Sequence, residues 1–248
     1  NFGQRSFTYT PPTGFVALQQ DNLPETDKGI SGLVWIKSRD TASAHMLFDS
    51  SRGPQLRIKP DSTSGETTSE GTVSKFLKGG YAVGDQTAVN TSGDSLVGWN
   101  WVANAGTTAS NTNGSITSTV QVNQTAGFSI VKWTSTGSNA TVGHGLSTAP
   151  SFILGKVLTR TDNWIVGHHK TSTTPWNNAT FLSVSDSQYT SAAYWNNTAP
   201  TSTVFTTGTW WYSSENYIAY CWHEVDGFSK FGNYIGNGSA DGPFVYTG

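Results

Sequence analysis

Two carboxylates, Glu224 and Asp226, have the spacing in this sequence that comes closest to a catalytic pattern. On a β-strand, residues two positions apart point to the same face, and hydrolysis of a glycosidic bond requires two such acidic groups. The fuller pattern E-x-D-x-x-E is incomplete, because Ser229 stands where the second glutamate would be. We therefore expect no enzymatic activity, and we keep a glycan-degrading enzyme that uses Glu224 and Asp226 as an alternative.

Metal-binding patterns are also weak. His168 and His169 are adjacent, so on a strand they would point to opposite faces and would not chelate one ion. His144 lies between two glycines, and we expect its ring to bond the backbone. Oxygen ligands for Ca²⁺ could come from aspartates that lie beside glycine or asparagine, namely Asp85, Asp94 and Asp241. We expect no cofactor, and we leave Ca²⁺ open.

Tryptophans in polar surroundings offer the stronger functional signal. Indole rings stack on the apolar faces of sugars, while neighbouring amide side chains can bond sugar hydroxyls. The candidate carbohydrate-binding residues are Trp176, Asn177, Trp195, Asn196, Trp210 and Trp211. The alternative is that these rings cap a core or lie at a subunit interface, where aromatic residues are enriched. The tryptophans in alternating apolar runs are predicted to be core: Trp35, Trp99, Trp101, Trp133 and Trp222.

The overall composition limits the classes of protein that remain. Charged residues make up 12% of the 248 residues, against about 25% in an ordinary globular domain. Aromatic residues also reach 12%, which is unlike a disordered chain. The net charge is −2, and Arg52 to Lys59 is the only basic concentration, so we expect no nucleic-acid partner. No apolar run approaches the ~20 residues of a membrane span, and we expect no membrane insertion.

Short alternating segments indicate the elements that would carry these residues. We identify period-two segments at 33–37, 152–154 and 217–222, and turn-forming residues bound each run. This pattern is typical of strands in a β-sandwich, and helical periodicity is almost absent. The sequence predicts an all-β fold of two tandem antiparallel β-sandwich units of the jelly-roll, or concanavalin A-like, type.

An internal repeat supports two related units. Residues 93–101 match 214–222 at an offset of 121, and 33–37 match 152–156 at an offset of 119. Residues 81–84 match 205–208 at an offset of 124. Three matches in the same order are the signature of a repeated supersecondary unit.

One further segment occurs three times, at 7–10, 130–134 and 244–248. Because its last copy begins a unit that the chain does not continue, we interpret the chain as part of a larger protein. The polar stretch 106–113 has the composition of a linker. We predict a lead-in at 1–15, a first unit at 16–105, a linker at 106–113 and a second unit at 114–248.

Two resemblances to known families add an expectation about location. Residues 1–7 (NFGQRSF) with 11–15 (PPTGF) resemble the closing strand of a SPRY domain, which would make 1–15 the end of an upstream domain. From Leu33 onward the chain resembles repeat-containing proteins of marine phages, including cyanophages, that are regarded as tail or virion components. The stretches that carry this resemblance are LVWIKSR at 33–39, HMLFDSSRG at 45–53, TVGHGL at 141–146 and FSKFGNY at 228–234.

The phage resemblance implies concanavalin A-like units and a place on the virion surface, outside the cell. It supplies no catalytic or binding residue. We expect a tail-fibre or tail-tip protein that contributes to recognition of a host surface glycan. A homo-oligomer, with a trimer favoured, and other virion proteins are the expected partners. The alternative is a purely structural virion protein, such as a capsid decoration or a fibre-shaft module, with no ligand.

Overall fold

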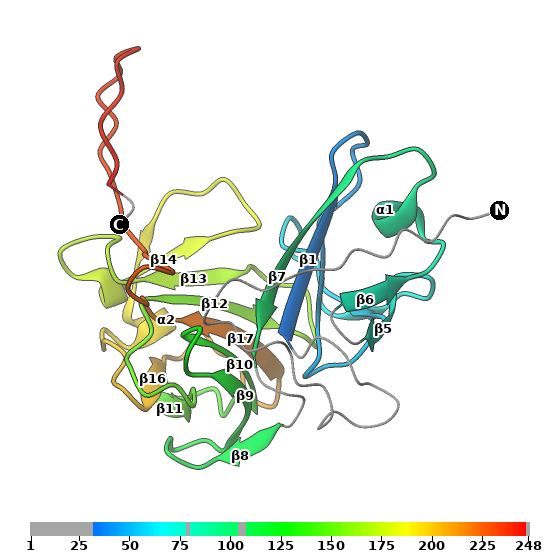
Figure 1. Ribbon diagram of the computed structural model, residues 1–248. Helices are drawn as coiled ribbons and strands as arrows, with labels where there is room; N and C mark the ends of the chain where they lie inside the picture. Colours follow the sequence, from blue (N-terminus) through cyan, green and yellow to red (C-terminus); the bar gives the residue numbers. More distant parts are fainter. Residues whose placement is uncertain (1–31, 78–79, 104–107, 247–248) are drawn as a thin grey trace.

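A computed structural model describes residues 32–77, 80–103 and 108–246 of the chain (Figure 1). These residues form several antiparallel β-sheets with two four-residue α-helices and one short 3-10 helix, so the all-β prediction is confirmed. None of these helices is long and apolar enough to cross a membrane. The predicted lead-in at 1–15 lies outside the described residues.

The largest element is an eight-stranded sheet in the order β15-β14-β13-β12-β17-β10-β9-β8. Its central strands are long and apolar, and β17 is buried at every position except its first. The strands of this sheet are β8 (Ala109–Asn111), β9 (Ser118–Asn123), β10 (Phe128–Thr134), β12 (Phe152–Val157), β13 (Ile165–His168), β14 (Asn178–Phe181), β15 (Tyr189–Thr190) and β17 (Asn216–Trp222).

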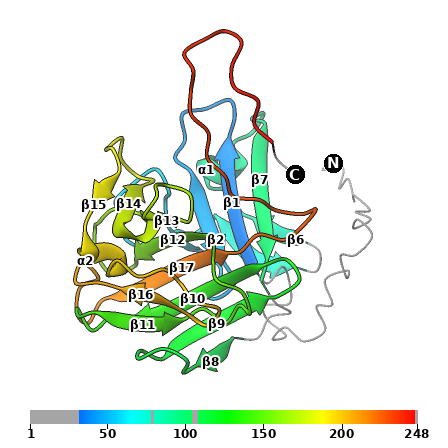
Figure 2. The same ribbon diagram turned by 90° about the vertical axis from the view of Figure 1, so that its left-hand side faces the viewer.

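Smaller elements cover this sheet on both sides (Figures 1 and 2). A three-stranded sheet in the order β2-β1-β7 comes from the first half of the chain: β1 (Gly32–Ser38), β2 (Met46–Asp49) and β7 (Leu96–Val102). Paired strands are β3 (Leu56–Arg57) with β4 (Thr67–Thr68), β5 (Val73–Leu77) with β6 (Gly80–Val83), and β11 (Ala140–Gly143) with β16 (Val204–Thr207). The helices are α1 (Thr87–Asn90), α2 (Ala192–Trp195) and the 3-10 turn Pro175–Asn177.

Alternating side chains give the eight-stranded sheet two apolar faces. On β17, Tyr217, Ala219 and Cys221 enter one cluster, and the residues between them enter another. The first cluster, the tryptophan core, contains Trp133, Trp176, Trp195 and Trp211. The second, the shared core, joins Leu33, Leu47 and Ile58 of the first half to residues of β10, β13 and β17.

The three-stranded sheet is apolar on both faces as well. Leu33 and Leu47 face the shared core. Val34, Ile36 and Phe48 face a third cluster, which Phe76 of β5 and Val89 of α1 complete. The molecule is therefore layered, with the three-stranded sheet packed between its own covering elements and the eight-stranded sheet.

Each half contains the same three-stranded element, with the same register between its strands. The order β2-β1-β7 in the first half corresponds to β13-β12-β17 in the second. Leu33 pairs with Trp101, and Phe152, which follows Leu33 by 119 residues, pairs with Trp222, which follows Trp101 by 121. The pairing of β1 with β2 matches that of β12 with β13 in the same way. The repeated sequence thus folds into a repeated structure.

The correspondence has limits. The third sequence match falls on β6 and β16, but β6 pairs with the preceding β5, whereas β16 pairs with the distant β11. Within the predicted linker 106–113, residues 109–111 form the edge strand β8. The described parts of the two halves also share a core rather than hanging as separate beads.

A shared core predicts one cooperative unfolding transition. Leu47 is fully buried in the shared core, and Leu47→Ala should reduce the free energy of unfolding by about 2–5 kcal/mol. Calorimetry should show a single transition in both proteins, shifted to lower temperature in the variant. Leu182→Ala, at a side chain that is 40% exposed, serves as the control with an effect within about 0.5 kcal/mol. Two separate transitions would contradict the shared core.

Candidate functional site

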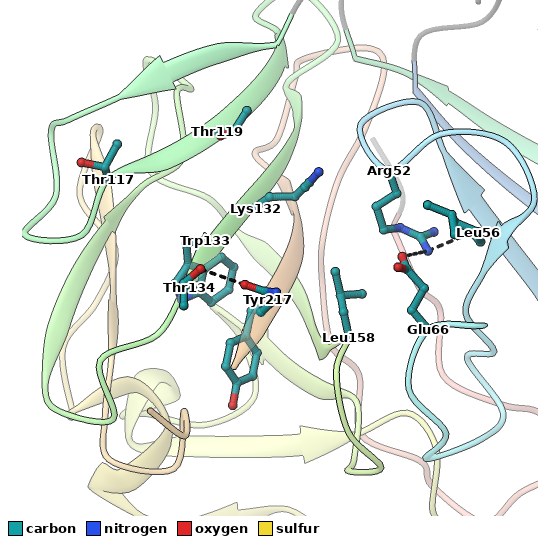
Figure 3. A pocket seen from close by; sticks show the side chains of 11 residues that line it. Arg52, Leu56, Glu66, Thr117, Thr119, Lys132, Trp133, Thr134, Leu158 and Tyr217 are labelled. Carbon is teal, nitrogen blue, oxygen red and sulfur yellow. Dashed lines mark hydrogen bonds and ion pairs between the residues drawn. The ribbon is translucent and has the colours of Figure 1, made fainter. Parts of the chain in front are cut away.

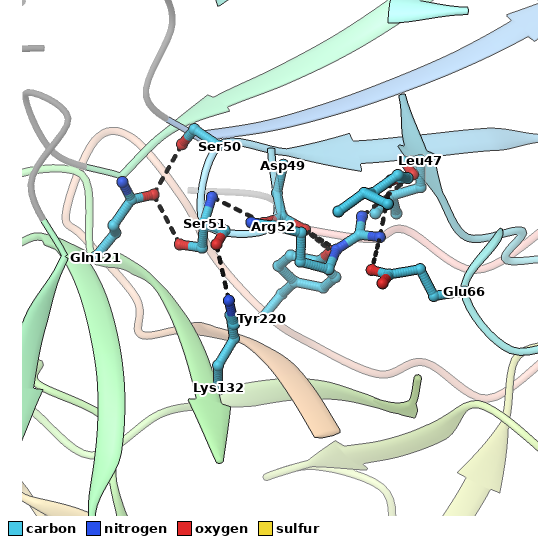
Figure 4. Close-up of polar contacts among 10 residues, drawn as sticks. Leu47, Asp49, Ser50, Ser51, Arg52, Glu66, Gln121, Lys132 and Tyr220 are labelled. Atoms are coloured by element: carbon cyan, nitrogen blue, oxygen red, sulfur yellow. Dashed lines mark hydrogen bonds and ion pairs between the residues drawn. The ribbon is translucent and has the colours of Figure 1, made fainter. Parts of the chain in front are cut away.

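A buried ionic network joins the two halves at the loop that follows β2 (Figure 4). The Asp49 carboxylate and the Arg52 guanidinium form an ion pair with side chains that are 0% and 1% exposed. Tyr220 Oη, on β17 of the second half, donates to Asp49 Oδ2 at 2.7 Å. Asp49 Oδ1 also accepts the backbone N–H groups of Ser51 and Arg52, at 3.0 and 2.9 Å. One carboxylate therefore holds both its own loop and the central strand of the other half.

The charge of Arg52 is compensated on several sides. Its Nη1 donates to Leu56 O and to Glu66 Oε2, each at 2.9 Å. Burial alone would lower the pKa of Arg52, but the negative charge of Asp49 and contributions from Tyr220 and Glu66 raise it above its ordinary value. Burial, followed by the charge of Asp49, raises the pKa of Tyr220 well above its ordinary value. Arg52 stays charged and Tyr220 stays a donor.

The same loop is tied to two more strands of the second half. The hydroxyls of Ser50 and Ser51 both donate to Gln121 Oε1 of β9 at 2.8 Å. Lys132 Nζ, on β10, donates to Ser51 O at 2.9 Å. Residues 49–52 thus lie as a plug against β9, β10 and β17 (Figure 4). Arg52, the first residue of the basic stretch, lies in this plug as the ion-pair partner of Asp49.

Beside this plug lies a polar cleft between the halves, with a volume of about 410 Å³ (Figure 3). The first half contributes Arg52, Leu56 and Glu66 to its lining. The second half contributes Thr117, Thr119, Lys132, Trp133, Thr134, Leu158, Asn216 and Tyr217. The lining thus offers hydroxyl, amide, ammonium and carboxylate groups.

The chemistry available in the cleft is hydrogen bonding. The Glu66 carboxylate already accepts a hydrogen bond from Arg52, and Lys132 already donates one to a backbone carbonyl. Thr134 Oγ1 donates to Asn216 Oδ1 at 2.8 Å. Acid–base catalysis of glycoside hydrolysis requires two carboxyl groups, and the described lining contains one. A polar molecule could bind here through the remaining hydroxyl positions.

The structure corrects the prediction that four tryptophans form a glycan platform. Trp176 is 6% exposed, and Trp195 and Trp211 are 0% exposed, so none of these rings can stack on a sugar. They pack edge to face and tilted against one another in the tryptophan core, with centroids 5.6 Å apart for Trp176–Trp195 and for Trp195–Trp211. The alternative interpretation, a capped core, holds for these three rings.

Glycines in the strands make room for these buried rings. A Cβ atom at Gly155 of β12 would lie 2.7 Å from the Trp211 ring, and one at Gly167 of β13 would lie 2.5 Å from the Trp176 ring. Glycine inside a strand often marks such a close approach. A glycine inside a strand is therefore a sequence signal for a close neighbour, but the sequence does not say that the neighbour is Trp176 or Trp211.

Trp210 packs at the margin of the tryptophan core, with its ring centroid 5.5 Å from that of Trp211, and it also joins a series of more accessible aromatic rings. It is half-buried, in the turn after β16, with ring centroids 5.7 Å from Tyr194 and 5.6 Å from Tyr212. Tyr189 of β15, which is 58% exposed, contacts Tyr194 at 6.1 Å. Arg160 lies 4.0 Å over the Tyr212 ring at the other end. We call Tyr189, Tyr194, Trp210 and Tyr212 the aromatic strip.

The two predicted asparagines are half-buried, and their backbones serve local structure. Asn177 ends the 3-10 turn, and its N–H donates to Thr174 O at 3.0 Å. Asn196 caps the C-terminus of α2 with φ of 49°. A left-handed residue at this position is a common way to end a helix, and asparagine adopts it more readily than most residues.

Glu224 and Asp226 do not lie on a strand, which corrects the premise that they share one face. β17 ends at Trp222. Glu224 Oε1 accepts the N–H of Phe231 at 3.0 Å and lies 3.5 Å from His169 Nε2. Asp226 is exposed in the turn that follows.

The aspartates considered for Ca²⁺ lie in separate places. Asp94 Oδ2 accepts hydroxyl hydrogens from Ser38 and Thr41, at 2.8 and 2.9 Å. Asp85 lies before α1, and Asp241 lies near the C-terminal end of the described chain. In the described residues no group of three or more His, Cys, Asp or Glu side chains could hold a metal ion.

His144 bonds the backbone, as its position between glycines predicts. Its side chain is buried, its Nε2 lies 3.1 Å from Thr201 O, and its Nδ1 accepts the N–H of Leu146 at 3.1 Å. Nε2 therefore carries the proton and donates to the carbonyl. Burial lowers the pKa of His144 from 6.5 to about 4.

Comparison with protein families yields one match. A family model described as a domain of unknown function, DUF7483, matches residues 26–248. The chain belongs to the DUF7483 family. No curated protein and no solved structure matches it. Membership of this family places the aromatic strip, the cleft and the buried network all within the family domain, because all their residues fall inside the matched range.

The buried network predicts an asymmetry between two arginines. Arg52→Met should lower the free energy of unfolding by about 3–5 kcal/mol, because Asp49 would be left buried without its partner. Arg160→Met, at a pair that is 4.0 Å apart with a 41% exposed arginine side chain, should change it by about 1 kcal/mol or less. Urea denaturation measures both values. Equal, small effects would show that the network does not hold the halves together.

Acid should destabilise the protein through His144. Because its folded-state pKa is depressed, the unfolded chain takes up the proton first, and stability is lost as the pH falls from 6.5 towards 4. A shift of this size corresponds to about 3 kcal/mol. The His144→Gln variant lacks this loss of stability at low pH. From pH 7 to pH 4, the difference in free energy of unfolding between the two proteins should therefore change by about 3 kcal/mol in favour of the variant. Urea denaturation at both pH values measures it, and a pH-independent difference would contradict it.

Proposed function

We propose that this chain is a component of a phage virion appendage, a tail fibre or tail tip, that contributes to recognition of a host surface glycan. The resemblance to marine phage proteins and the low content of charged residues, 12%, support a virion-surface, extracellular location. The observation that carries glycan contact is the aromatic strip. It places three accessible or half-buried rings, Tyr189, Trp210 and Tyr212, along one connected series.

The geometry of the strip suits a sugar chain. Tyr189 is largely exposed, and Trp210 and Tyr212 keep part of their surface accessible. Tyr and Trp combine an apolar ring with a hydrogen-bonding group, so they suit sites that are apolar on one side and solvated on the other. The packing of Tyr194 between Tyr189 and Trp210 fixes the ring positions before any ligand arrives. Pre-formed sites lose less conformational entropy on binding than flexible ones.

We further propose that each half derives from one jelly-roll-like, concanavalin A-like unit. The matching registers of β2-β1-β7 and β13-β12-β17 support a common origin for the two halves. A homo-oligomer, with a trimer favoured as in many fibre proteins, and other virion proteins remain the proposed partners.

A second candidate function is a structural virion module without a ligand. The observation that favours it is the exposed apolar side chains near the C-terminal end, Phe244, Val245 and Tyr246. Exposed apolar groups that lie together are one mark of a protein–protein contact. Imaging of the particle separates the two proposals: density at the tail supports the appendage, and density on the capsid lattice supports decoration.

Replacement of Trp210 tests the glycan proposal. Trp210→Ala should weaken binding to a marine-polysaccharide array and to intact marine bacteria by about tenfold or more, equivalent to about 1.4 kcal/mol. Tyr234→Ala removes a 67% exposed ring outside the strip and should leave binding unchanged. Circular dichroism confirms that both variants are folded. Equal binding by the folded Trp210→Ala protein, or no binding by the unsubstituted protein, would overturn the proposal.

A further inference from the structure

The strand β7 has an unpaired edge where its counterpart in the second half has a partner. β17 lies between β12 and β10, whereas β7 pairs only with β1 among the described residues. The repeat makes β7 equivalent to β17, so the open edge of β7 is the position that β10 fills in the other half. Gly98, Trp99 and Asn100 in the middle of β7 are exposed. Such an edge can accept a further strand.

An exposed arm carries a segment that matches β10. Residues 232–246 are exposed at every position and project from the side of the molecule near β13 and β14, away from β7 in Figure 1. Residues 244–247 (FVYT) repeat the apolar, any, aromatic, Thr pattern of 131–134 (VKWT) in β10. Phe244, Val245 and Tyr246 are 89%, 46% and 68% exposed.

The base of the arm is held by contacts that leave this segment accessible. Phe231 stacks on Phe152 with ring centroids 5.6 Å apart, and its carbonyl lies 2.8 Å from His169 Nε2. Lys230, which precedes Phe231, lies 4.7 Å over the Tyr246 ring, so the end of the arm folds back beside its base. The arm thus leaves the body from a fixed point and folds back towards it, while Phe244, Val245 and Tyr246 keep solvent-exposed surface.

We propose that residues 244–246 of one copy of this chain pair with the open edge of β7 in a second copy. β10 pairs with β17 through Val131 opposite Ala219 and Trp133 opposite Tyr217. The repeat carries this register over, so that Phe244 lies opposite Gly98, Val245 opposite Val97 and Tyr246 opposite Leu96. Main-chain hydrogen bonds provide affinity in this mode of recognition, and alternate side chains provide specificity.

The side chains of the arm fit the faces that they would meet. Leu96 is half-buried and packs with Tyr81 against the cluster that contains Val34 and Phe76. Phe244 and Tyr246 would extend this cluster, and Gly98 has no side chain to oppose Phe244. Val245 would fall on the opposite face, which carries the partly buried Trp35 of the shared core. The exposed apolar surface of both copies would then be covered.

The resulting contact is head to tail. Each copy donates one arm and accepts one, so the same contact generates a closed ring or an extended filament. This inference does not depend on the glycan proposal, because the aromatic strip and β7 share no residue. The same-chain segment at 7–10 carries a related pattern, FTYT, and is the competing occupant.

Engineered cysteines test the register directly. Paired residues in an antiparallel sheet have Cα atoms about 4.5–5.5 Å apart, within the range of a disulfide. A full-length Val97→Cys chain mixed under mild oxidation with a differently tagged Val245→Cys chain should yield a disulfide-linked heterodimer. Tyr246→Cys in place of Val245→Cys points to the other face and should link poorly. The unsubstituted chains, whose Cys221 is buried, should not link.

Two outcomes would overturn the proposal. If a single chain with Thr8→Cys and Val97→Cys forms an internal disulfide while the mixed chains form none, the edge is filled from within the same chain. If light scattering shows a monomer at every concentration, no second copy binds. The proposal predicts that the unsubstituted chain forms larger assemblies as its concentration rises. Val245→Pro, which removes one backbone donor from the arm, should weaken that association about tenfold.

Discussion

The ion pair between Asp49 and Arg52 holds the arrangement of the two halves. Both side chains are almost completely buried, and their remaining polar atoms are satisfied by Glu66 and by Tyr220 of the other half. A buried ion pair often adds little net stability compared with apolar residues of the same shape. It does penalise other arrangements strongly, because each misplaced charge would lose its partner inside a low-dielectric core. We interpret the network as the element that fixes how the first half docks.

Given this docking, the repeat explains the layered architecture. A strand that is apolar on both faces must be covered on both sides, and both copies of the repeated three-stranded element have such strands. The second copy is extended to eight strands and is covered on one face by the first copy and on the other by the tryptophan core. The first copy stays at three described strands, and it is here that an open edge remains. The unequal extension of the two related units thus leaves the edge of β7 without a partner among the described strands.

Several features could be predicted from the sequence for physical reasons. The run 217–222 identified a strand, and the offsets of 119 and 121 residues predicted a repeated unit, whose strand pairs share one register in the structure. Trp176, Trp195 and Trp211 were misassigned because their immediate neighbours are polar, while the glycines that accommodate Trp176 and Trp211 lie in other strands. Whether a ring is buried depends on the segments that pack over it in the folded protein. The composition of its immediate sequence neighbours does not report this.

The buried network was also beyond local reasoning. Arg52 lies in the only basic stretch of the sequence, and its ion-pair partner is Asp49. Nothing in the neighbouring sequence indicates that the distant Tyr220 donates a hydrogen bond to the Asp49 carboxylate. The turn after β2, in which Asp49 accepts two backbone N–H groups, is a local pattern that could have been recognised. Its contact with β17 is set by the tertiary fold alone. Long-range polar partners of this kind follow from topology.

The central claim is that the two repeat-related elements form one cooperative body through their shared core and the Asp49–Arg52–Tyr220 network. Native-state hydrogen exchange tests this claim most directly, because it reports the opening free energy of each strand separately. The account predicts that the protected amides of β1 exchange with the same opening free energy as those of β12 and β17, near the global value. Exchange of β1 through a much lower-energy opening, while β12 and β17 stay protected, would contradict it.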